Sequence, residues 1–350
     1  MMGLHLGVVI VAFNSADVIG ECLESLYASE GAKLHVVVVD NRSDDATLAV
    51  VADWAAGRNV ARRHEAAPIP IGPATKPVSV VERVPGEPAA DAGELTLIRS
   101  PVNGGFAYAV NLGLRALRQR EEIDAFWLLN PDCVVAPDTA RLYLNDAARA
   151  PFGLLACRTL YYEHPDMIQT DGGRIDRSAA CQGINFGLSA AETPLPAPAA
   201  LDYVSGANMV ASRAFIERAG LMEEDYFLYY EEVDWAMKRG NLPLRLVPGA
   251  RVFHHGGTTI GTGSATRRPQ PFANYFNYRN RVRFARRHMP GSMPLVVLRA
   301  LAKAAQLLTL RAPEEAGAVI AGTFNRRPSD RIVARITDPA ARRLAFGRGA

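Results

Sequence analysis

The stretch 229–235 sets carboxylates among aromatic rings and is the clearest sign of chemistry in this chain. Burying Glu231 or Glu232 beside rings is costly unless the carboxylate binds a cation or exchanges a proton. A deprotonated glutamate held over a substrate hydroxyl can take its proton in the transition state. The same pattern is compatible with a plain acidic helix N-terminus, in which Asp234 pairs with Lys238 on the helix surface.

Two other short segments offer ligands for a metal ion. Asn130 and Asp132 follow the apolar run Phe126–Leu129, while His254 and His255 follow a strand-like run and precede glycines. A hard cation such as Mg²⁺ often keeps one or two protein carboxylates together with substrate phosphates. We therefore predict that Asp132 and one of the two histidines bind a cation. The alternatives are a turn without a ligand and a solvent-exposed histidine pair.

Apolar runs alternate with helical patterns through the first 130 residues. The predicted strands are Leu6–Phe13, Leu34–Val39, Leu95–Ile98 and Phe126–Leu129, and the predicted helices follow Asn14-Ser15, run from Ser43 or Asp44 to Trp54, and span Phe106–Leu117. This alternation predicts an α/β protein with a mostly parallel sheet, whose sites lie at the carboxyl ends of its strands. Asp40, Asn103 and Asp132 all fall at such ends.

Two regions depart from the alternation. Residues 58–94 contain six prolines between Pro68 and Pro88, which predicts an exposed insertion, either a partly disordered loop or a small hairpin around Val78–Val84. Residues 294–310 are apolar on one side and carry Arg299 and Lys303. This pattern predicts an amphipathic helix that lies on a membrane surface or docks on the domain.

Charge is distributed unevenly along the chain. From Arg267 to the C-terminus there are 17 Lys and Arg and 4 Asp and Glu, whereas the rest has 22 basic and 32 acidic residues. A basic tail favours an anionic partner, such as a membrane surface, a phospholipid-linked substrate or nucleic acid, and solvated basic helices are the alternative. The candidate contacts for nucleic acid are arginines interleaved with aromatic residues: Arg279, Arg281, Arg283, Arg286 and Arg287.

Several classes of protein are disfavoured. The four cysteines, Cys22, Cys133, Cys157 and Cys181, are scattered and are expected to be reduced thiols. Residues 1–13 lack a basic leader and a cleavage site, so we expect a first strand and a cytoplasmic protein. The first predicted strand is followed by no glycine fingerprint, and no Gly-Lys-Ser/Thr triplet occurs, which argues against dinucleotide-binding Rossmann and P-loop enzymes.

Taken in order, these segments resemble the inverting nucleotide-sugar glycosyltransferases of family 2, and in particular rhamnosyltransferase-like bacterial enzymes. The residues that carry the resemblance are Val11-Ala12-Phe13-Asn14, Val39-Asp40-Asn41-Arg42-Ser43, Asn103-Gly104-Gly105-Phe106-Ala107 with Asn111-Leu112-Gly113, Leu129-Asn130-Pro131-Asp132, Ser205-Gly206-Ala207, the stretch 227–235 and His254-His255-Gly256-Gly257. The resemblance implies a GT-A catalytic domain over residues 1–265, with a mostly parallel central sheet flanked by helices. A basic, helical C-terminal extension follows over residues 266–350.

The resemblance also implies roles for single residues. Donor-binding residues would be Phe13, Asn14, Asp40, Asn103, Gly104, Gly105, Phe106, Asn111 and Asn130, and acceptor-side residues would be Gly206, Ala207 and Asp234. Asp132 and His254, with His255 as the alternative to His254, would bind Mg²⁺ or Mn²⁺, and Asn130 replaces the first acid of the family's Asp-X-Asp motif. Glu232 matches the catalytic base and Glu231 is its rival. Asp40 alone could equally brace its loop.

The implied activity is inverting transfer of one sugar from a nucleoside-diphosphate sugar to a hydroxyl of a glycan or lipid-linked acceptor. The resemblance favours dTDP-rhamnose as donor and a place in cell-wall or polysaccharide biosynthesis. No Gln-X-X-Arg-Trp motif occurs, which argues against a processive synthase. The alternative is a catalytically decayed nucleotide-sugar-binding protein. A peripheral location on the inner membrane face and a homodimer are further expectations, whereas nucleic acid is not expected as a partner.

Overall fold

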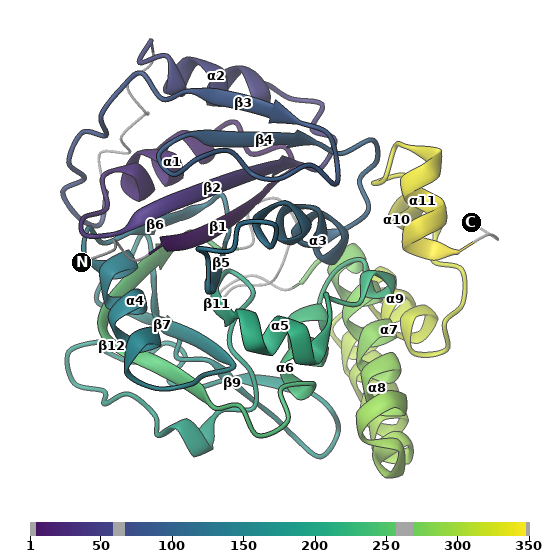
Figure 1. Cartoon of the computed structure of the whole chain (residues 1–350). Coiled ribbons are helices and arrows are strands. Elements are labelled where there is room, and N and C mark those ends of the chain that lie inside the picture. Colours follow the sequence, from purple (N-terminus) through teal and green to yellow (C-terminus); the bar gives the residue numbers. More distant parts are fainter. Residues whose placement is uncertain (1–4, 59–66, 257–268, 348–350) are drawn as a thin grey trace.

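A mixed β-sheet forms the centre of the protein, as seen in a computed structural model that describes residues 5–58, 67–256 and 269–347 (Figure 1). Within these residues the sheet has ten strands in the order β3-β4-β2-β1-β5-β11-β7-β12-β6, with β8 paired to β7. The strands are β1 His5–Ala12, β2 Lys33–Asp40, β3 Val80–Arg83, β4 Leu95–Arg99, β5 Ala125–Leu129, β6 Cys133–Val135, β7 Leu154–Tyr161, β8 Ile168–Thr170, β11 Asn208–Ser212 and β12 Leu244–His254. A separate pair joins β9 Gly173–Ile175 to β10 Cys181–Gly183.

The first half of the sheet is parallel, as predicted. Strands β3, β4, β2, β1 and β5 pair in parallel, and the register places Ala12 opposite Asp40 and Ile10 opposite Leu129. The antiparallel strand β11 then joins β5 to β7. Because β1, β2 and β5 end side by side, the residues that follow them meet at one edge of the sheet.

Helices cover both faces of the sheet because the central strands are apolar on both sides. The helices are α1 Ile19–Tyr27, α2 Thr47–Ala55, α3 Phe106–Leu117, α4 Thr139–Arg149, α5 Arg213–Ala219, α6 Glu231–Met237, α7 Pro271–His288, α8 Met293–Thr309, α9 Pro313–Thr323, α10 Asp330–Val333 and α11 Pro339–Phe346. Val8 and Ile10 share a core with α1, α2 and α4, whereas Val9 and Val11 share one with α3, α5 and α6. This alternation is the two-residue period of a strand.

The described part of the predicted insertion is integrated into the fold. The segment expected to form a hairpin instead supplies β3, which pairs in parallel with β4 as an edge strand. Ala74 and Val78 are buried against the α1–α2 side of the sheet. Glu24 on α1 accepts hydrogen bonds from the Ala74 amide at 3.0 Å and from the Trp54 indole at 2.6 Å. The prediction failed because proline spacing does not report these long-range contacts.

The C-terminal helices lie beside the sheet and pack on the body (Figure 1). α8 confirms the helix predicted over 294–310, and α7 begins the described part of the extension that was predicted to be helical. Phe272, Phe276 and Ile332 share an apolar cluster with Phe227 of the preceding part of the chain. The boundary predicted at 265/266 lies outside the described residues. In the described ranges, one helical stretch, Pro290–Thr309, is long and apolar enough to cross a membrane by length and composition.

Candidate active site

The loops after β1 and β2 are bonded to each other at the edge of the sheet. The Asn14 amide donates to Ser43 Oγ at 3.0 Å, and the Asp44 amide donates to Asn14 Oδ1 at 2.9 Å. Asp40 is buried at the end of β2, and its Oδ1 accepts from the Ser43 amide at 3.3 Å. Asp40 therefore braces its loop, and its contact with a nucleobase stays a prediction. Phe13 is half-buried in the same loop pair.

The glycine loop before α3 is held against the same edge. Asn41 Nδ2 donates to Asn103 Oδ1 at 3.0 Å and to the Gly105 carbonyl at 3.2 Å, while Asn41 Oδ1 accepts from the Gly104 amide at 3.2 Å. Gly105 has a φ of 88°, and a Cβ there would lie 2.2 Å from the Phe227 carbonyl oxygen. Only glycine permits this approach, which brings the stretch 227–235 to the glycine loop.

Asp132 and His254 form a pair suited to a cation. His254 Nε2 lies 3.1 Å from Asp132 Oδ1 and 3.4 Å from Asn130 Nδ2. Burial of Asp132 opposes its ionisation, but the neighbouring His254 lowers the pKa of the carboxyl below its usual value. Burial likewise opposes the imidazolium, but Asp132 raises the pKa of His254. Carboxylate and imidazole together suit a divalent ion such as Mn²⁺.

A neighbouring side chain orients His254. Its Nδ1 lies 2.6 Å from Gln169 Oε1, so Nδ1 donates to Gln169 and Nε2 is the ring nitrogen that faces Asp132. Metal-binding histidines commonly use such a partner to fix the ring. His255 points elsewhere, since its ring stacks on Tyr162 at 3.7 Å and its Nδ1 lies 2.8 Å from Glu163 Oε1. Of the two histidines, the geometry favours His254.

The Asp132–His254 pair has a third possible ligand, Cys133, and one other group of described side chains could bind a metal ion. Cys133 lies within 4.8 Å of the Asp132–His254 pair, but burial raises the pKa of its thiol, which donates to the Ala207 carbonyl. His5, His35 and Glu122 lie together near the starts of β1 and β2, at the opposite end of the sheet. There His5 Nδ1 already bonds His35 Nε2 at 2.8 Å, and Arg120 lies 3.9 Å from Glu122.

Gly206 and Ala207 lie between the Asp132–His254 pair and the glutamates at the start of α6. The Asn130 amide donates to the Ala207 carbonyl at 2.9 Å. A Cβ built on Gly206 would lie 3.6 Å from the Glu232 side chain and 3.6 Å from the Phe106 ring. The structure thus brings Asn130, Gly206, Phe106 and Glu232 together from four distant segments.

The two glutamates at the start of α6 differ in access. Glu231 is buried, and its Oε2 has no hydrogen-bond partner among the described residues, whereas Glu232 is half-buried. Burial raises the pKa of both carboxyls, and the charge of Glu232 adds to the effect on Glu231. Groups with raised carboxyl pKa values in a cleft are candidates for proton transfer. Glu232 is the one that a substrate can reach.

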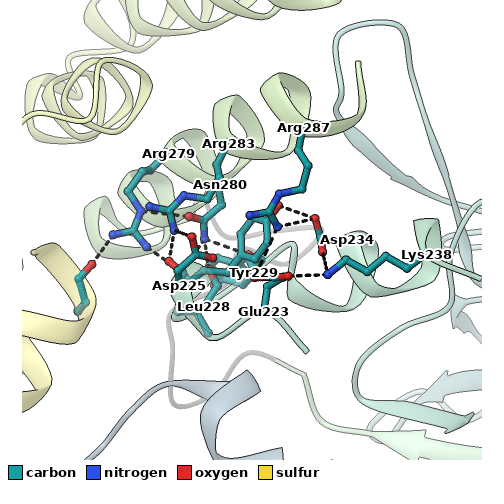
Figure 2. A network of polar contacts seen from close by, with 12 residues as sticks. Glu223, Asp225, Leu228, Tyr229, Asp234, Lys238, Arg279, Asn280, Arg283 and Arg287 are labelled. Carbon is teal, nitrogen blue, oxygen red and sulfur yellow. Dashed lines mark hydrogen bonds and ion pairs between the residues drawn. The ribbon is translucent and has the colours of Figure 1, made fainter. Parts of the chain in front are cut away.

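The segment before these glutamates has a strained backbone. Phe227, Tyr229 and Tyr230 have φ values of 64°, 70° and 74°, which are unusual for residues other than glycine. Each such residue costs about 1–3 kcal/mol and persists only when its surroundings enforce it. The enforcing element is α7, which lies across the segment (Figure 2).

α7 holds the strained segment by its backbone carbonyls. Asn280 Nδ2 lies 2.9 Å from the Tyr226 oxygen, 2.7 Å from the Leu228 oxygen and 2.9 Å from the Tyr229 oxygen. Arg279 donates to the Tyr226 carbonyl at 2.7 Å, and Arg283 donates to the Asp225 carbonyl (Figure 2). The helix predicted to belong to a separate extension therefore positions the candidate base.

Two predicted site residues have structural roles. Asn111 is buried, and its amide bonds the Met222 carbonyl at 2.9 Å and the Met222 amide at 3.0 Å, so no geometry supports its place in the donor site. Asp234 was expected on the acceptor side, with a surface pair to Lys238. Instead it is fully buried, 2.9 Å from Arg287, 2.7 Å from His288 and 3.1 Å from Lys238 (Figure 2). Periodicity identified the pair but not the helix that covers it.

The arginine cluster of α7 is largely used inside the protein. Arg279 and Arg281 are buried, and Arg281 donates to the Ser178 carbonyl at 2.7 Å. Arg283 and Arg287 pair with Asp225 and Asp234. These contacts favour a structural role over the alternative of nucleic-acid contacts.

Sequence reasoning missed Gln169 and Asn280. Gln169 is the middle residue of the short strand β8, and no sequence motif around it points to a role in the site. Asn280 lies in the aromatic and arginine-rich pattern of 272–289, whose most obvious property is its charge. The one available signal was that Asn280 is an uncharged amide among arginines, and a buried amide needs hydrogen-bond partners in the core.

The chain is similar to known glycosyltransferases in part of its sequence. Residues 7–66 match the family model described as glycosyl transferase family 2. The hexosyltransferase Agl10 of low-salt glycan biosynthesis from Haloferax volcanii is 21% identical over 194 residues, which cover 54% of this chain and 59% of that relative. The match thus spans under two thirds of that protein.

Solved structures have the same architecture. Residues 1–349 of S. aureus TarS superpose with a TM-score of 0.50 at 14% identity, covering 98% of this chain and 86% of that one. The mannosyltransferase PcManGT from Pyrobaculum calidifontis, solved with GDP-Man and Mn²⁺, gives 0.49 at 18% identity, covering 97% and 80%. The fold is that of the GT-A glycosyltransferases, and the match to the family 2 glycosyltransferase model is confined to residues 7–66.

Proposed function

We propose that this chain is an inverting glycosyltransferase that moves one sugar from a nucleoside-diphosphate sugar to an acceptor hydroxyl. The observation that carries the proposal is the arrangement around Gly206 and Ala207. These residues touch Asn130, next to the Asp132–His254 pair, on one side and Glu232 on the other. A cation site and a reachable carboxylate are thus adjacent at the edge where α/β proteins bind ligands.

Asp132 and His254 would hold Mg²⁺ or Mn²⁺. The fit rests on a half-buried carboxylate, an imidazole whose Nδ1 is fixed by Gln169, and an Nε2 that faces the carboxylate. When bound, the cation would offset the negative charge that develops on the departing diphosphate.

Glu232 would act as general base. In the transfer, the acceptor oxygen forms a bond to the anomeric carbon while the bond from that carbon to the diphosphate breaks. The acceptor proton goes to the Glu232 carboxylate. Attack from the face opposite the leaving group inverts the anomeric centre and needs no enzyme nucleophile. Glu231 is the rival base because one of its buried oxygens lacks a hydrogen-bond partner among the described residues.

The donor and acceptor are narrower proposals. The nucleotide would lie on the bonded loops of Asn14, Asp40 and Asn103, and dTDP-rhamnose is the first donor to test because of the sequence resemblance. The acceptor would be a glycan or a lipid-linked sugar, and a fold shared by many activities does not select between them.

The first experiment is thermal unfolding with dTDP, UDP and GDP, each with Mn²⁺ and then with EDTA. A ligand that binds only the folded protein raises the melting temperature. We expect a rise with one nucleotide that EDTA removes, followed by transfer from the matching sugar nucleotide to a glycan acceptor. The anomeric configuration of the product, read by NMR, tests inversion.

Two results would contradict the proposal. If none of the nucleotides raises the melting temperature of folded protein, the chain does not have the proposed nucleotide site. A metal-dependent rise without transfer or donor hydrolysis across a panel of sugars and acceptors would instead support the catalytically decayed binding protein.

A further inference from the structure

The helix α8 presents its larger apolar side chains to solvent. Val296, Ala300, Ala304 and Leu307 are buried against the neighbouring helices. On the outer side Leu298, Leu301 and Leu308 are 63%, 43% and 58% exposed. A helix of a globular protein ordinarily buries its leucines and exposes polar residues. Here the inner face carries two alanines, a valine and one leucine, whereas three leucines lie on the outer face.

The exposed side chains form one stripe along the helix. Pro294, Leu298, Leu301, Ala305 and Leu308 follow one another at steps of four and three residues and all are exposed. Residues at this spacing lie on one face of a helix. We name these five residues the α8 stripe. Contiguous exposed apolar surface of this kind marks an interaction site.

The charged residues of the α8 segment indicate the kind of partner. Between residues 290 and 311 the charged residues are Arg299, Lys303 and Arg311, with no Asp or Glu. Arg299 is paired with Asp176 at 3.2 Å, whereas Lys303 Nζ bonds Gln306 on the same helix at 2.9 Å. A second copy of the stripe would bring like charges together, whereas an anionic surface complements them.

We propose that the α8 stripe lies on the surface of an anionic lipid bilayer, with α8 parallel to the membrane plane. The leucines enter the boundary between headgroups and acyl chains, and Lys303 and Arg311, which lie on other sides of the same segment, attract the anionic surface at longer range. The helix does not cross the bilayer. Ala300, Ala304 and Leu307 share a core with Val319 of α9, which a spanning helix would have to abandon.

The orientation would place the enzyme on a membrane that carries its acceptor. α8 lies beside α7 and α9, to one side of the sheet (Figure 1). α7 in turn holds the segment that bears Glu231 and Glu232. Binding to lipid can be measured without sugar transfer, so it is tested independently of the proposed activity.

The test is flotation of the full-length protein with vesicles of phosphatidylcholine, alone or with about a quarter phosphatidylglycerol. We expect binding to the anionic vesicles that weakens at high salt. Burying one leucine changes a partition coefficient by about tenfold. Because these leucines are partly shielded already, the triple variant L298Q/L301Q/L308Q should bind roughly 30-fold more weakly. The matched control is Leu188→Gln, which changes a leucine 49% exposed on another segment.

A fluorescence measurement covers the case in which the triple variant does not fold. The three native tryptophans, Trp54, Trp127 and Trp235, are fully buried. Leu308→Trp therefore adds an exposed reporter whose emission should shift to shorter wavelength with anionic vesicles. Failure of the wild type to float with anionic vesicles would overturn the proposal, as would equal flotation of the folded triple variant. A dimer that the triple variant abolishes, without lipid binding, would assign the stripe to a second copy of the chain.

Discussion

Glu232 and Glu231 are adjacent in sequence but differ in what can reach them. Glu232 lies beside Gly206 and Phe106 and is half-buried, whereas Glu231 is buried. Glu232→Gln should bind nucleotide normally and lower kcat by about 10²–10⁴, the usual contribution of a general base. Glu231→Gln should lower kcat by less than about tenfold. Steady-state kinetics on both variants decides the assignment, and the reverse order of effects would make Glu231 the base.

The same pair makes stability depend on pH. Burial raises the pKa of Glu231 above the ordinary glutamate value of about 4.3. Between that value and the raised pKa, the folded state binds more protons than the unfolded state, so the free energy of unfolding falls as the pH rises. Glu231→Gln removes this dependence. Its melting temperature should exceed that of the wild type at about pH 9 and differ less at about pH 5.

Gln169 should matter to metal binding without touching the metal. It fixes the ring of His254 through Nδ1, and loss of such a partner commonly weakens metal affinity about 10–100-fold. Gln169→Ala should therefore require more Mn²⁺ for half-maximal thermal stabilisation in the presence of nucleotide. The matched control is Gln182→Ala, a glutamine on the exposed strand β10. If Gln169→Ala requires no more Mn²⁺ than the wild type, either His254 does not bind the metal or Gln169 does not orient His254.

At the scale of elements, α7 determines the conformation of the segment before α6. Asn280 contacts three of its carbonyl oxygens, and three residues of the segment have positive φ values. Asn280→Ala removes the amide that these three oxygens share, while Arg279 still donates to Tyr226, and should destabilise the fold by about 1–3 kcal/mol. Because the glutamates move with the segment, kcat should fall about tenfold or more, with little change in the donor KM.

The control for this experiment is Asn277→Ala, which removes a half-buried asparagine from the same helix. A purely structural role of Asn280 would lower the melting temperature but leave kcat per folded molecule unchanged. That outcome would show that α7 stabilises the fold without positioning the glutamates for catalysis.

At the scale of the whole molecule, the C-terminal helices and the sheet domain share contacts and should unfold together. Gly322 on α9 faces α7, and a Cβ there would lie 2.3 Å from the Tyr275 carbonyl oxygen. Gly322→Ala must push the two helices apart and should cost about 1–3 kcal/mol. Gly317→Ala on the same helix meets no atom within 4 Å and should be neutral or slightly stabilising. Denaturant unfolding followed by fluorescence and circular dichroism should give one transition for both; two separate transitions would show that the extension folds alone.

Local residue patterns predicted the α/β architecture and much of the catalytic edge. Buried parallel strands read as continuous apolar runs, so β1, β2 and β5 were identified closely, and a residue that follows such a strand must lie at its carboxyl end. For this reason the order of residues along the chain was enough to assign Asp40, Asn103 and Asp132 to one edge. The start of α6 at Glu231 was found in the same way, from its acidic first turn.

Only the tertiary structure decided which side chains face one another. It separated His254 from His255, assigned Asn111 and Asp234 to structural bonds, and turned the segment expected as a hairpin into the edge strand β3. It also placed Asn280 on the segment 226–229, more than fifty residues away in sequence. Periodicity and spacing report neighbours along the chain, whereas these contacts join distant segments whose register and burial depend on the packing of the whole molecule.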